Sequence, residues 1–212
     1  MTRPARPENA REVAALTDGI DEVRERWEQS HRAYWSLRSP GAAPIAALAA
    51  EDSASVQALM RTFAEMVAAR GAGVGGVTQA RNNGARGRSR IVLRDLLTGA
   101  DYPISQDLGP GSVACNLDNS ELALACAAVE KAARGGVDIV FISKFAKQEA
   151  ARAGLCDAFR AAISARIPVV TAVSPYFRNE WRAFAGELAT DVSPDLEALE
   201  AWWSRIQTAE KI

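Results

Sequence analysis

The sequence predicts an α/β fold: a three-layer sandwich on a mainly parallel sheet, with an inserted β-hairpin and an N-terminal helical arm. From residue 45 onward, short apolar runs alternate with segments of helical periodicity, which is typical of parallel strands joined by crossover helices. The 212 residues are enough for one such domain and an appendage, but not for two enzyme domains. The 42 alanines supply apolar surface of little bulk, which suits helices packed closely on a sheet.

The first 44 residues predict a helical arm followed by a linker. Apolar residues recur in the arm at spacings of three and four, interrupted only at Ser30. These apolar residues are Val13, Leu16, Ile20, Val23, Trp27, Tyr34 and Leu37. Prolines and a glycine in residues 39–44 oppose helix continuation, so we divide the chain into an arm with linker, 1–44, and a domain, 45–212. The arm either folds onto its own domain or joins two copies of the chain, and we expect a homo-oligomer formed through it.

The first half of the domain predicts two strands, a helix and a hairpin. Residues 45–50 form a strand, and residues 53–70 form a helix with Ser53 as its N-cap and Gly71 just beyond its end. Residues 73–79 form the second strand. Residues 90–93 and 102–105 flank a turn-rich stretch and resemble an antiparallel hairpin inserted after that strand.

The second half continues the alternation of helix and strand. Asp118 and Glu121 start a helix that runs to about residue 134, since acidic groups favour its positive end. Residues 137–143 are continuously apolar and predict a central strand covered on both faces. A helix over 147–166, a strand over 167–173 and helices over 179–188 and 193–207 follow. Ser193 is the N-cap of the last helix and Pro194 its first residue.

Composition excludes several classes of function. With 25 basic and 26 acidic residues, the chain has no global electrostatic case for binding nucleic acid or an anionic membrane. No apolar run approaches the ~18 residues of a membrane span and the start lacks a signal-peptide core, so we expect a cytoplasmic protein. The single histidine, His31, lies outside the domain, which excludes a catalytic histidine there. Three scattered cysteines form neither a disulfide framework nor a CxxC zinc site.

Seven collinear segments carry the most specific pattern in the domain. They are GVTQ (76–79), LRDLLTG (93–99), ISQDLGPGS (104–112), CNLD (115–118), SKFAKQEA (143–150), PVVTAV (168–173) and WRAFAGELA (181–189). Together they resemble a bacterial family of uncharacterised proteins that is often associated with molybdenum-transport genes. That family looks like a degenerate relative of small P-loop nucleoside-triphosphatases and nucleotide kinases. The resemblance implies a P-loop-like fold over nearly all of residues 45–206.

Both halves of the P-loop triphosphate machinery are missing where the resemblance places them. A P-loop needs GxxxxGK[ST], because glycines let backbone N–H groups converge on phosphates and lysine neutralises their charge. Residues 49–56, AAEDSASV, contain neither glycine nor lysine, and Glu51 and Asp52 put negative charge at the helix start. Ser143 and Lys144 replace the acidic pair that would hold magnesium. These losses argue against ordinary nucleotide hydrolysis.

Two lysines are the main candidates for binding an anion. Loops at the carboxyl ends of the strands are where open α/β sheets bind ligands. Lys144 and Lys147 bring positive charge there, and Glu149 could orient one of them. Gln79 and Arg81, after the second strand, are candidates at the same edge. The ordinary alternative for the lysines is a solvated helix start.

A second candidate segment follows the hairpin. Two glycines in residues 107–112 permit a backbone nest whose N–H groups hold an oxyanion, although a plain turn explains them equally well. Cys115, close behind, is either a soft ligand or a buried small residue. The candidates from this segment are Asp107, Gly109, Gly111 and Ser112.

Residues 81–94 form the basic patch of the chain. They contain five arginines and no acidic residue, which predicts a mobile loop that clamps a phosphate, an oxyanion or a nucleic-acid backbone, or a merely solvated loop. The arginines are Arg81, Arg86, Arg88, Arg90 and Arg94. The patch has no aromatic residue on which bases could stack, so binding of single-stranded nucleic acid is disfavoured.

Two main hypotheses of function follow. The first is a non-catalytic small-ligand or oxyanion-binding, regulatory protein on a degenerate P-loop-like scaffold, with a link to molybdenum metabolism implied only by the resemblance. The alternative is a nucleoside-triphosphatase or phosphotransferase with a non-standard phosphate site. A third, compatible hypothesis is a dimeric adaptor that acts through the arm. We expect a small anion or nucleotide-like ligand and no membrane partner, and the sequence identifies no cofactor.

Overall fold

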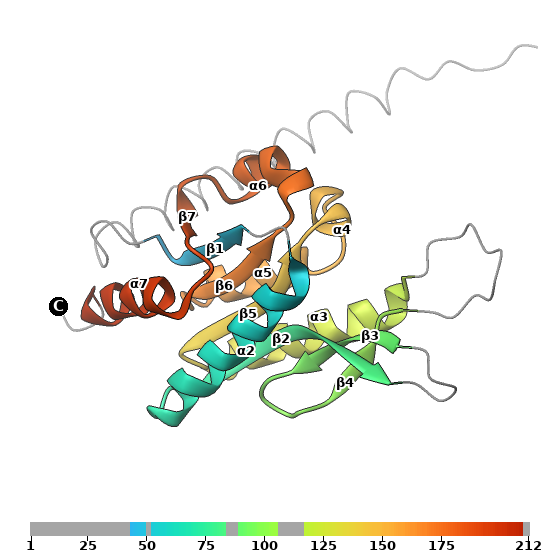
Figure 1. The fold of residues 1–212 in the computed structure, drawn as a ribbon, viewed down its shortest axis with the longest axis horizontal. Helices are drawn as coiled ribbons and strands as arrows, with labels where there is room; N and C mark the ends of the chain where they lie inside the picture. The colour runs from blue at the N-terminus through green and yellow to red at the C-terminus, as the bar shows by residue number, and fades with distance from the viewer. Residues whose placement is uncertain (1–42, 50–51, 84–88, 106–116, 210–212) are drawn as a thin grey trace, which may run out of the picture.

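The computed structural model describes residues 43–49, 52–83, 89–105 and 117–209, and these form one seven-stranded sheet in the order β4-β3-β2-β5-β6-β1-β7 (Figure 1). The parallel strands are β2 (Val74–Asn83), β5 (Ile139–Phe145), β6 (Val169–Val173), β1 (Ile45–Ala49) and β7 (Ala189–Val192). Two further strands, β3 (Ser89–Asp95) and β4 (Asp101–Pro103), extend the sheet antiparallel beyond β2. The predicted mainly parallel sheet with an inserted hairpin is confirmed.

Helices cover both faces of the sheet, so the fold has the predicted three layers (Figure 1). On one face, here named the α2 face, α2 (Ser53–Ala69) and α7 (Leu196–Ala209) pack on a core that includes Phe63, Phe141 and Trp202. On the other, the α3 face, lie α3 (Asn119–Arg134), α5 (Cys156–Ser164) and α6 (Arg178–Ala185). The shorter helices are α4 (Lys147–Ala150), η1 (Pro175–Phe177) and η2 (Gly186–Leu188).

Two helices begin at an aspartate rather than at the serine that the sequence suggests. The Asp52 side chain accepts the N–H two residues further on, so Ser53 is the first residue of α2 and not its cap. Asp195 accepts the N–H three residues further on, so the predicted start of α7 at Ser193 and Pro194 is wrong. The predicted cap of α3, Asp118, is confirmed.

The helix predicted over 147–166 is divided into α4 and α5. The backbone turns left-handed between them, with φ of 59° at Arg152 and 63° at Gly154. A side chain at Gly154 would place its Cβ 2.3 Å from Glu149 Oε1, so this close approach requires glycine. The apolar spacing continues across the break, and it therefore does not reveal that the helix stops.

Strand β7 is an element that the sequence patterns do not predict. It has four residues, Ala189–Val192, and pairs with β1 alone. Its Asp191 is exposed, and a run this short shows no alternation long enough to indicate a strand. Pairing with the apolar strand β1 therefore determines β7 more than its own residues do.

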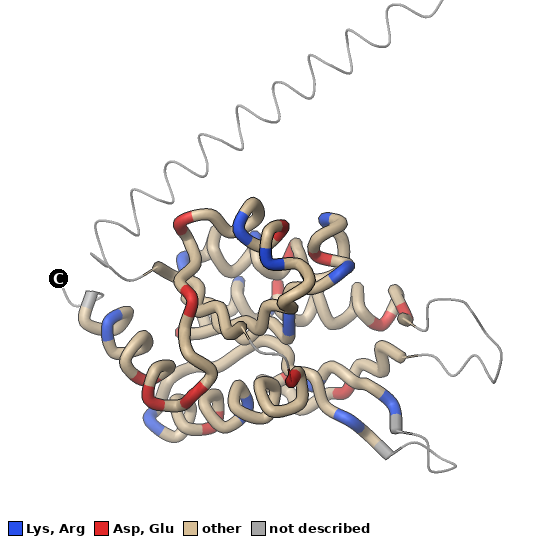
Figure 2. The backbone as a smooth tube through the Cα atoms, turned by 45° about the horizontal axis from the view of Figure 1, so that its top comes forward, with Lys and Arg blue, Asp and Glu red and all other residues tan. Residues whose placement is uncertain are grey.

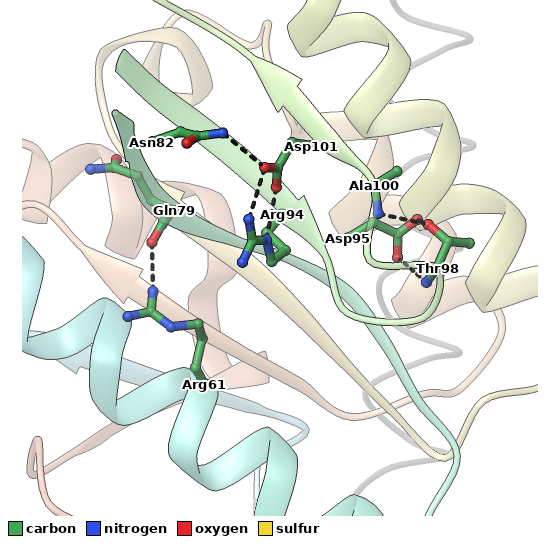
Figure 3. A network of polar contacts seen from close by, with 8 residues as sticks. All are labelled: Arg61, Gln79, Asn82, Arg94, Asp95, Thr98, Ala100 and Asp101. Atoms are coloured by element: carbon green, nitrogen blue, oxygen red, sulfur yellow. Dashed lines mark hydrogen bonds and ion pairs between the residues drawn. The ribbon is translucent and has the colours of Figure 1, made fainter. Parts of the chain in front are cut away.

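The arginine-rich segment is mostly strand, which corrects the predicted mobile loop. Arg81 pairs with Ile91 and Arg94 with Thr78 in the β2–β3 ladder. The Arg94 guanidinium also donates two hydrogen bonds of 2.8 Å to Asp101 on β4 (Figure 3). These hydrogen bonds hold the pKa of the Asp101 carboxyl below its usual value. Residues 84–88 and residues 1–42, nearly all of the predicted arm and linker (1–44), lie outside the described residues.

Candidate functional site

Lys144 lies inside β5 rather than in the loop after it. A β-bulge precedes it, because Ile142 pairs with Thr171 while Lys144 pairs with the very next residue, Ala172. Ala172 belongs to the core of the α2 face, and directly paired residues share a face of the sheet. The bulge therefore directs Lys144 to the α2 face at the carboxyl end of the strand. The side chain is half-buried and forms no ion pair with another described residue.

Gln57 on α2 joins β5 to β2 at the point where these strands separate. Their ladder ends at the pair Val77 and Ile142. Beyond it, Gln57 Nε2 donates to the carbonyl of Ser143 at 2.5 Å, and Gln57 Oε1 accepts from the N–H of Gln79 at 2.6 Å. The side chain is only 2% exposed. The Gln57 amide thus replaces the hydrogen bonds that would join β2 to β5 at this point, and it ties both strands to α2.

Two buried hydroxyls beside Gln57 have no hydrogen-bond partner among the described residues: Ser53 Oγ and Thr78 Oγ1. Ser53 lies one turn before Gln57 and so on the same side of α2. Thr78 is fully buried. The next residue, Gln79, pairs with Leu93 in the core of the α3 face. Because successive side chains of a strand point to opposite faces, Thr78 faces α2. Leaving a buried hydroxyl unpaired costs about 1–3 kcal/mol, so native proteins usually pair such groups.

The negatively charged side chain of Asp52 caps the start of α2. The two carboxylate oxygens of Asp52 accept hydrogen bonds from the Ser55 hydroxyl and the Ala54 N–H. The Ser55 bond, followed by the Ala54 bond, lowers the pKa of Asp52. Beside this carboxylate, the polar side chains described at this end of the α2 face include the hydroxyls of Ser53 and Thr78, the Gln57 amide and the Lys144 ammonium. Such a set can hold an anion.

The other candidates in the described residues lie apart from Lys144. Gln79 pairs with Leu93, which is in the core of the α3 face, so the side chains of Gln79 and Arg81 point to that face. Lys147 is exposed at the first residue of α4. Glu149 orients no lysine, because its carboxylate oxygens accept the N–H groups of residues 146 and 155, each at 3.0 Å. The structure thus places Lys144 on the same face and at the same end of the sheet as Ser53, Gln57 and Thr78, rather than with the predicted set.

The candidates of the second segment, Asp107, Gly109, Gly111, Ser112 and Cys115, lie outside the described residues. Two buried thiols do lie within them. Burial raises the pKa of both Cys126 and Cys156 to about 11, so neither is a reactive thiolate near neutral pH. No group of three or more potential metal ligands occurs in the described part of the chain. None of its helices is long and apolar enough to span a membrane.

Sequence reasoning missed Gln57 and Thr78. Gln57 lies three residues before Met60 on the buried side of α2, and a polar residue at such a position signals a buried hydrogen bond. Thr78 gives no comparable signal, since threonine is common in strands and its missing partner depends on where β2 leaves β5.

The fold is similar to a solved structure whose activity is stated. That structure is described as the solution structure of a human cancer-related nucleoside triphosphatase. The two agree with a TM-score of 0.53 and 14% sequence identity, over 78% of this chain and 97% of the other. At this identity the likeness concerns the fold, and it confirms the predicted P-loop-NTPase-like architecture.

The chain belongs to the family described as protein of unknown function (DUF2478), whose sequence model matches residues 45–202. It is also 38% identical over 161 residues to the molybdenum import ATP-binding protein ModC 2 of Bradyrhizobium diazoefficiens. The matched region is 75% of this chain but only 18% of that protein. The chain therefore spans less than a fifth of the length of this relative.

Proposed function

We propose that this protein binds a small oxyanion, without catalysis, at the carboxyl end of the sheet on the α2 face. The observation that carries the proposal is a pair of buried hydroxyls, Ser53 Oγ and Thr78 Oγ1, without a partner among the described residues. They lie on the same face and at the same end of the sheet as Lys144, which forms no ion pair with another described residue. An oxyanion accepts hydrogen bonds from hydroxyls and pairs with an ammonium, so it would satisfy all three groups.

The non-catalytic part of the proposal rests on the residues present in the sequence. Residues 49–56 supply neither the glycines nor the lysine of a phosphate loop, and Ser143 and Lys144 stand where carboxylates would hold magnesium. We therefore describe the scaffold as a degenerate P-loop fold that has kept a place for one anion, and we place the protein in the cytoplasm.

Molybdate is our proposed ligand among oxyanions. The relative from Bradyrhizobium diazoefficiens is a molybdenum import ATP-binding protein, and the region that it shares with this chain is a small part of its length. A domain that matches only 18% of an import protein is better suited to sensing or carrying the oxyanion than to acting as the whole import ATPase. We therefore propose a regulatory, anion-binding role in molybdenum metabolism.

Calorimetric titration of the full chain with molybdate, tungstate and phosphate tests the proposal. Lys144→Gln removes one charge-assisted interaction worth about 1.5–3 kcal/mol, so molybdate affinity should fall roughly ten- to a hundredfold. Lys147→Gln is the matched control, because Lys147 is exposed on α4, and it should bind as the wild type does. Equal affinities in the two variants would move the site away from Lys144.

Thr78→Val separates a ligand site from a structural defect. Valine keeps the shape of threonine and removes a hydroxyl that has no partner among the described residues, so the ligand-free protein should be as stable as wild type or more stable. Molybdate affinity should nevertheless fall. The control is Thr171→Val, because Thr171 is equally buried but its hydroxyl already donates to Ala172. Loss of stability without loss of affinity in Thr78→Val would contradict the proposal.

A phosphate-release assay with ATP or GTP and magnesium tests the alternative function. Our proposal expects no turnover above the level of a heat-denatured sample. Turnover that Lys144→Ala abolishes would instead establish a triphosphatase with a non-standard phosphate site.

A further inference from the structure

Strand β2 changes its hydrogen-bonding partners along its length. Up to Val77 it lies between β5 and β3, and beyond Val77 only β3 remains. The N–H of Leu96 on the β3 side donates to the carbonyl of Gly76. Even-numbered residues of β2 therefore bond toward β3, and odd-numbered residues bond toward the side that β5 has left. From Thr78 to Asn83, β2 and β3 continue as an antiparallel ribbon, and β4 pairs with the other edge of β3 opposite Thr78 to Ala80 (Figure 1).

Two side chains of α2 bind the main chain of Gln79, the first outward-bonding residue on this edge of β2 after Val77. The main chain of Gln79 receives both available partners, since its N–H donates to Gln57 Oε1 and its carbonyl accepts from Arg61 Nη1 at 2.9 Å (Figure 3). The next outward N–H and carbonyl belong to Arg81, and neither pairs with another described residue. Among the described residues, the edge of β2 is therefore unpaired at Arg81.

The charge around this open edge is positive. Arg81 on β2 and Arg90 on β3 are both exposed, and Figure 2 shows basic residues on both strands of the ribbon. Arg94 is neutralised by Asp101, but residues 81–94 contain no acidic residue of their own. An incoming strand with acidic side chains would match both the hydrogen-bonding groups and the charge.

We propose that the open edge of β2 at Arg81 accepts an extended acidic segment of a partner protein by β-strand addition. The main chain of the segment pairs with the N–H and carbonyl of Arg81, and its carboxylates lie against the Arg81 side chain on the α3 face. Arg90 pairs with Asn82 and faces the other side, so it adds only to the positive charge of the ribbon. A protein is favoured over a nucleic acid because nucleic acids have no main-chain ladder to add to a strand. The sequence of residues 81–94 also contains no aromatic residue for stacking.

The probe is a synthetic hexapeptide of alternating glutamate and valine, and its control is the same peptide with lysine in place of glutamate. The full chain is titrated with each, and amide hydrogen exchange is followed by NMR. The acidic peptide should bind, should slow exchange of the Arg81 amide, and should bind less tightly as salt rises. The lysine peptide should neither bind nor slow exchange of the Arg81 amide.

Arg81→Pro removes the outward N–H and spares the bonds to β3, which residues 80 and 82 make. Binding of the acidic peptide should weaken roughly three- to tenfold from the loss of that hydrogen bond, beyond the effect of lost charge. Arg81→Ala keeps the N–H and measures the charge alone, with a loss of roughly two- to fivefold. Arg160→Ala, an exposed arginine on α5, should change nothing.

Three outcomes would overturn this inference. Arg81→Pro could bind as tightly as Arg81→Ala, which would show that the main chain takes no part. The lysine peptide could bind as well as the acidic one. A duplex DNA probe could bind in a salt-dependent manner while the Arg81 amide exchanges unchanged, which would make the ribbon a nucleic-acid surface. None of these results depends on the anion site at Lys144.

Discussion

The two faces of the sheet differ at the carboxyl ends of its central strands. On the α3 face, Phe145 packs against Trp181 and Phe184, with ring centroids 5.1 and 5.2 Å apart. On the α2 face, polar side chains from the sheet and from α2 lie at the same end of the strands. These are Ser53 and Gln57 on α2, Thr78 on β2 and Lys144 on β5. The difference shows that one face of this edge serves packing, while the other concentrates the groups that a polar ligand needs.

The largest expected effect lies on the apolar face. Trp181→Ala should lower the free energy of unfolding by about 3–5 kcal/mol, because Trp181 is buried between Phe145, Phe159 and Phe184. Urea or guanidinium titration measures the change. Tyr176→Ala is the control, since Tyr176 is 91% exposed and its removal should stay within about 0.5 kcal/mol. Equal effects of the two variants would mean that the aromatic cluster contributes little.

The next effect lies on the polar face. Gln57→Leu keeps the approximate volume of the side chain but leaves the Ser143 carbonyl and the Gln79 N–H without their partner. Two such losses should cost about 2–4 kcal/mol. Gln207→Leu, on the exposed side of α7, is the control in the same denaturation experiment. A cost no greater than that of the control would show that other groups replace the glutamine.

The β-bulge in β5 and the hydrogen bonds of Gln57 also show which features can be predicted from the sequence and which cannot. The central strand at 137–143, the cap Asp118 and the inserted hairpin follow from local patterns, because apolar runs and capping residues act over a few positions. The direction of Lys144 does not, since it depends on an extra residue in β5 relative to β6. The open hydroxyl of Thr78 likewise depends on where β2 and β5 part, which only the assembled sheet determines.

The buried thiols give a smaller, pH-dependent contrast. Burial raises the pKa of Cys126 and Cys156 from 9.0 to about 11, so the folded protein holds protons that the unfolded chain releases first. Their contribution to stability is complete below pH 9 and is lost as the pH rises toward 11. Unfolding measured over this range should show a steeper decline for wild type than for a Cys126→Ala/Cys156→Ala variant. Parallel pH profiles would show that the thiols titrate alike in both states.

The smallest expected effect on the domain comes from removing the predicted arm. Helices already cover both faces of the sheet, so a chain starting at Ala43 should keep its unfolding free energy. It also keeps the bond from Trp202 Nε1 to the Ala43 carbonyl. If the arm joins copies of the chain, as we propose, light scattering should show fewer subunits per particle than for the full chain. An unchanged subunit number would mean that the arm is not required for assembly.

The position of β1 in the sheet has a consequence for synthesis of the protein. β1 is made first among the described strands, yet both of its neighbours, β6 and β7, come from residues 169–192. On the ribosome, β1 and α2 therefore wait for most of the domain before either edge of β1 is paired. Domains whose contacts join distant parts of the chain fold slowly and expose unpaired edges while they wait. We expect this domain to complete its sheet only after synthesis has passed β7, with β1 as the last strand to gain both neighbours.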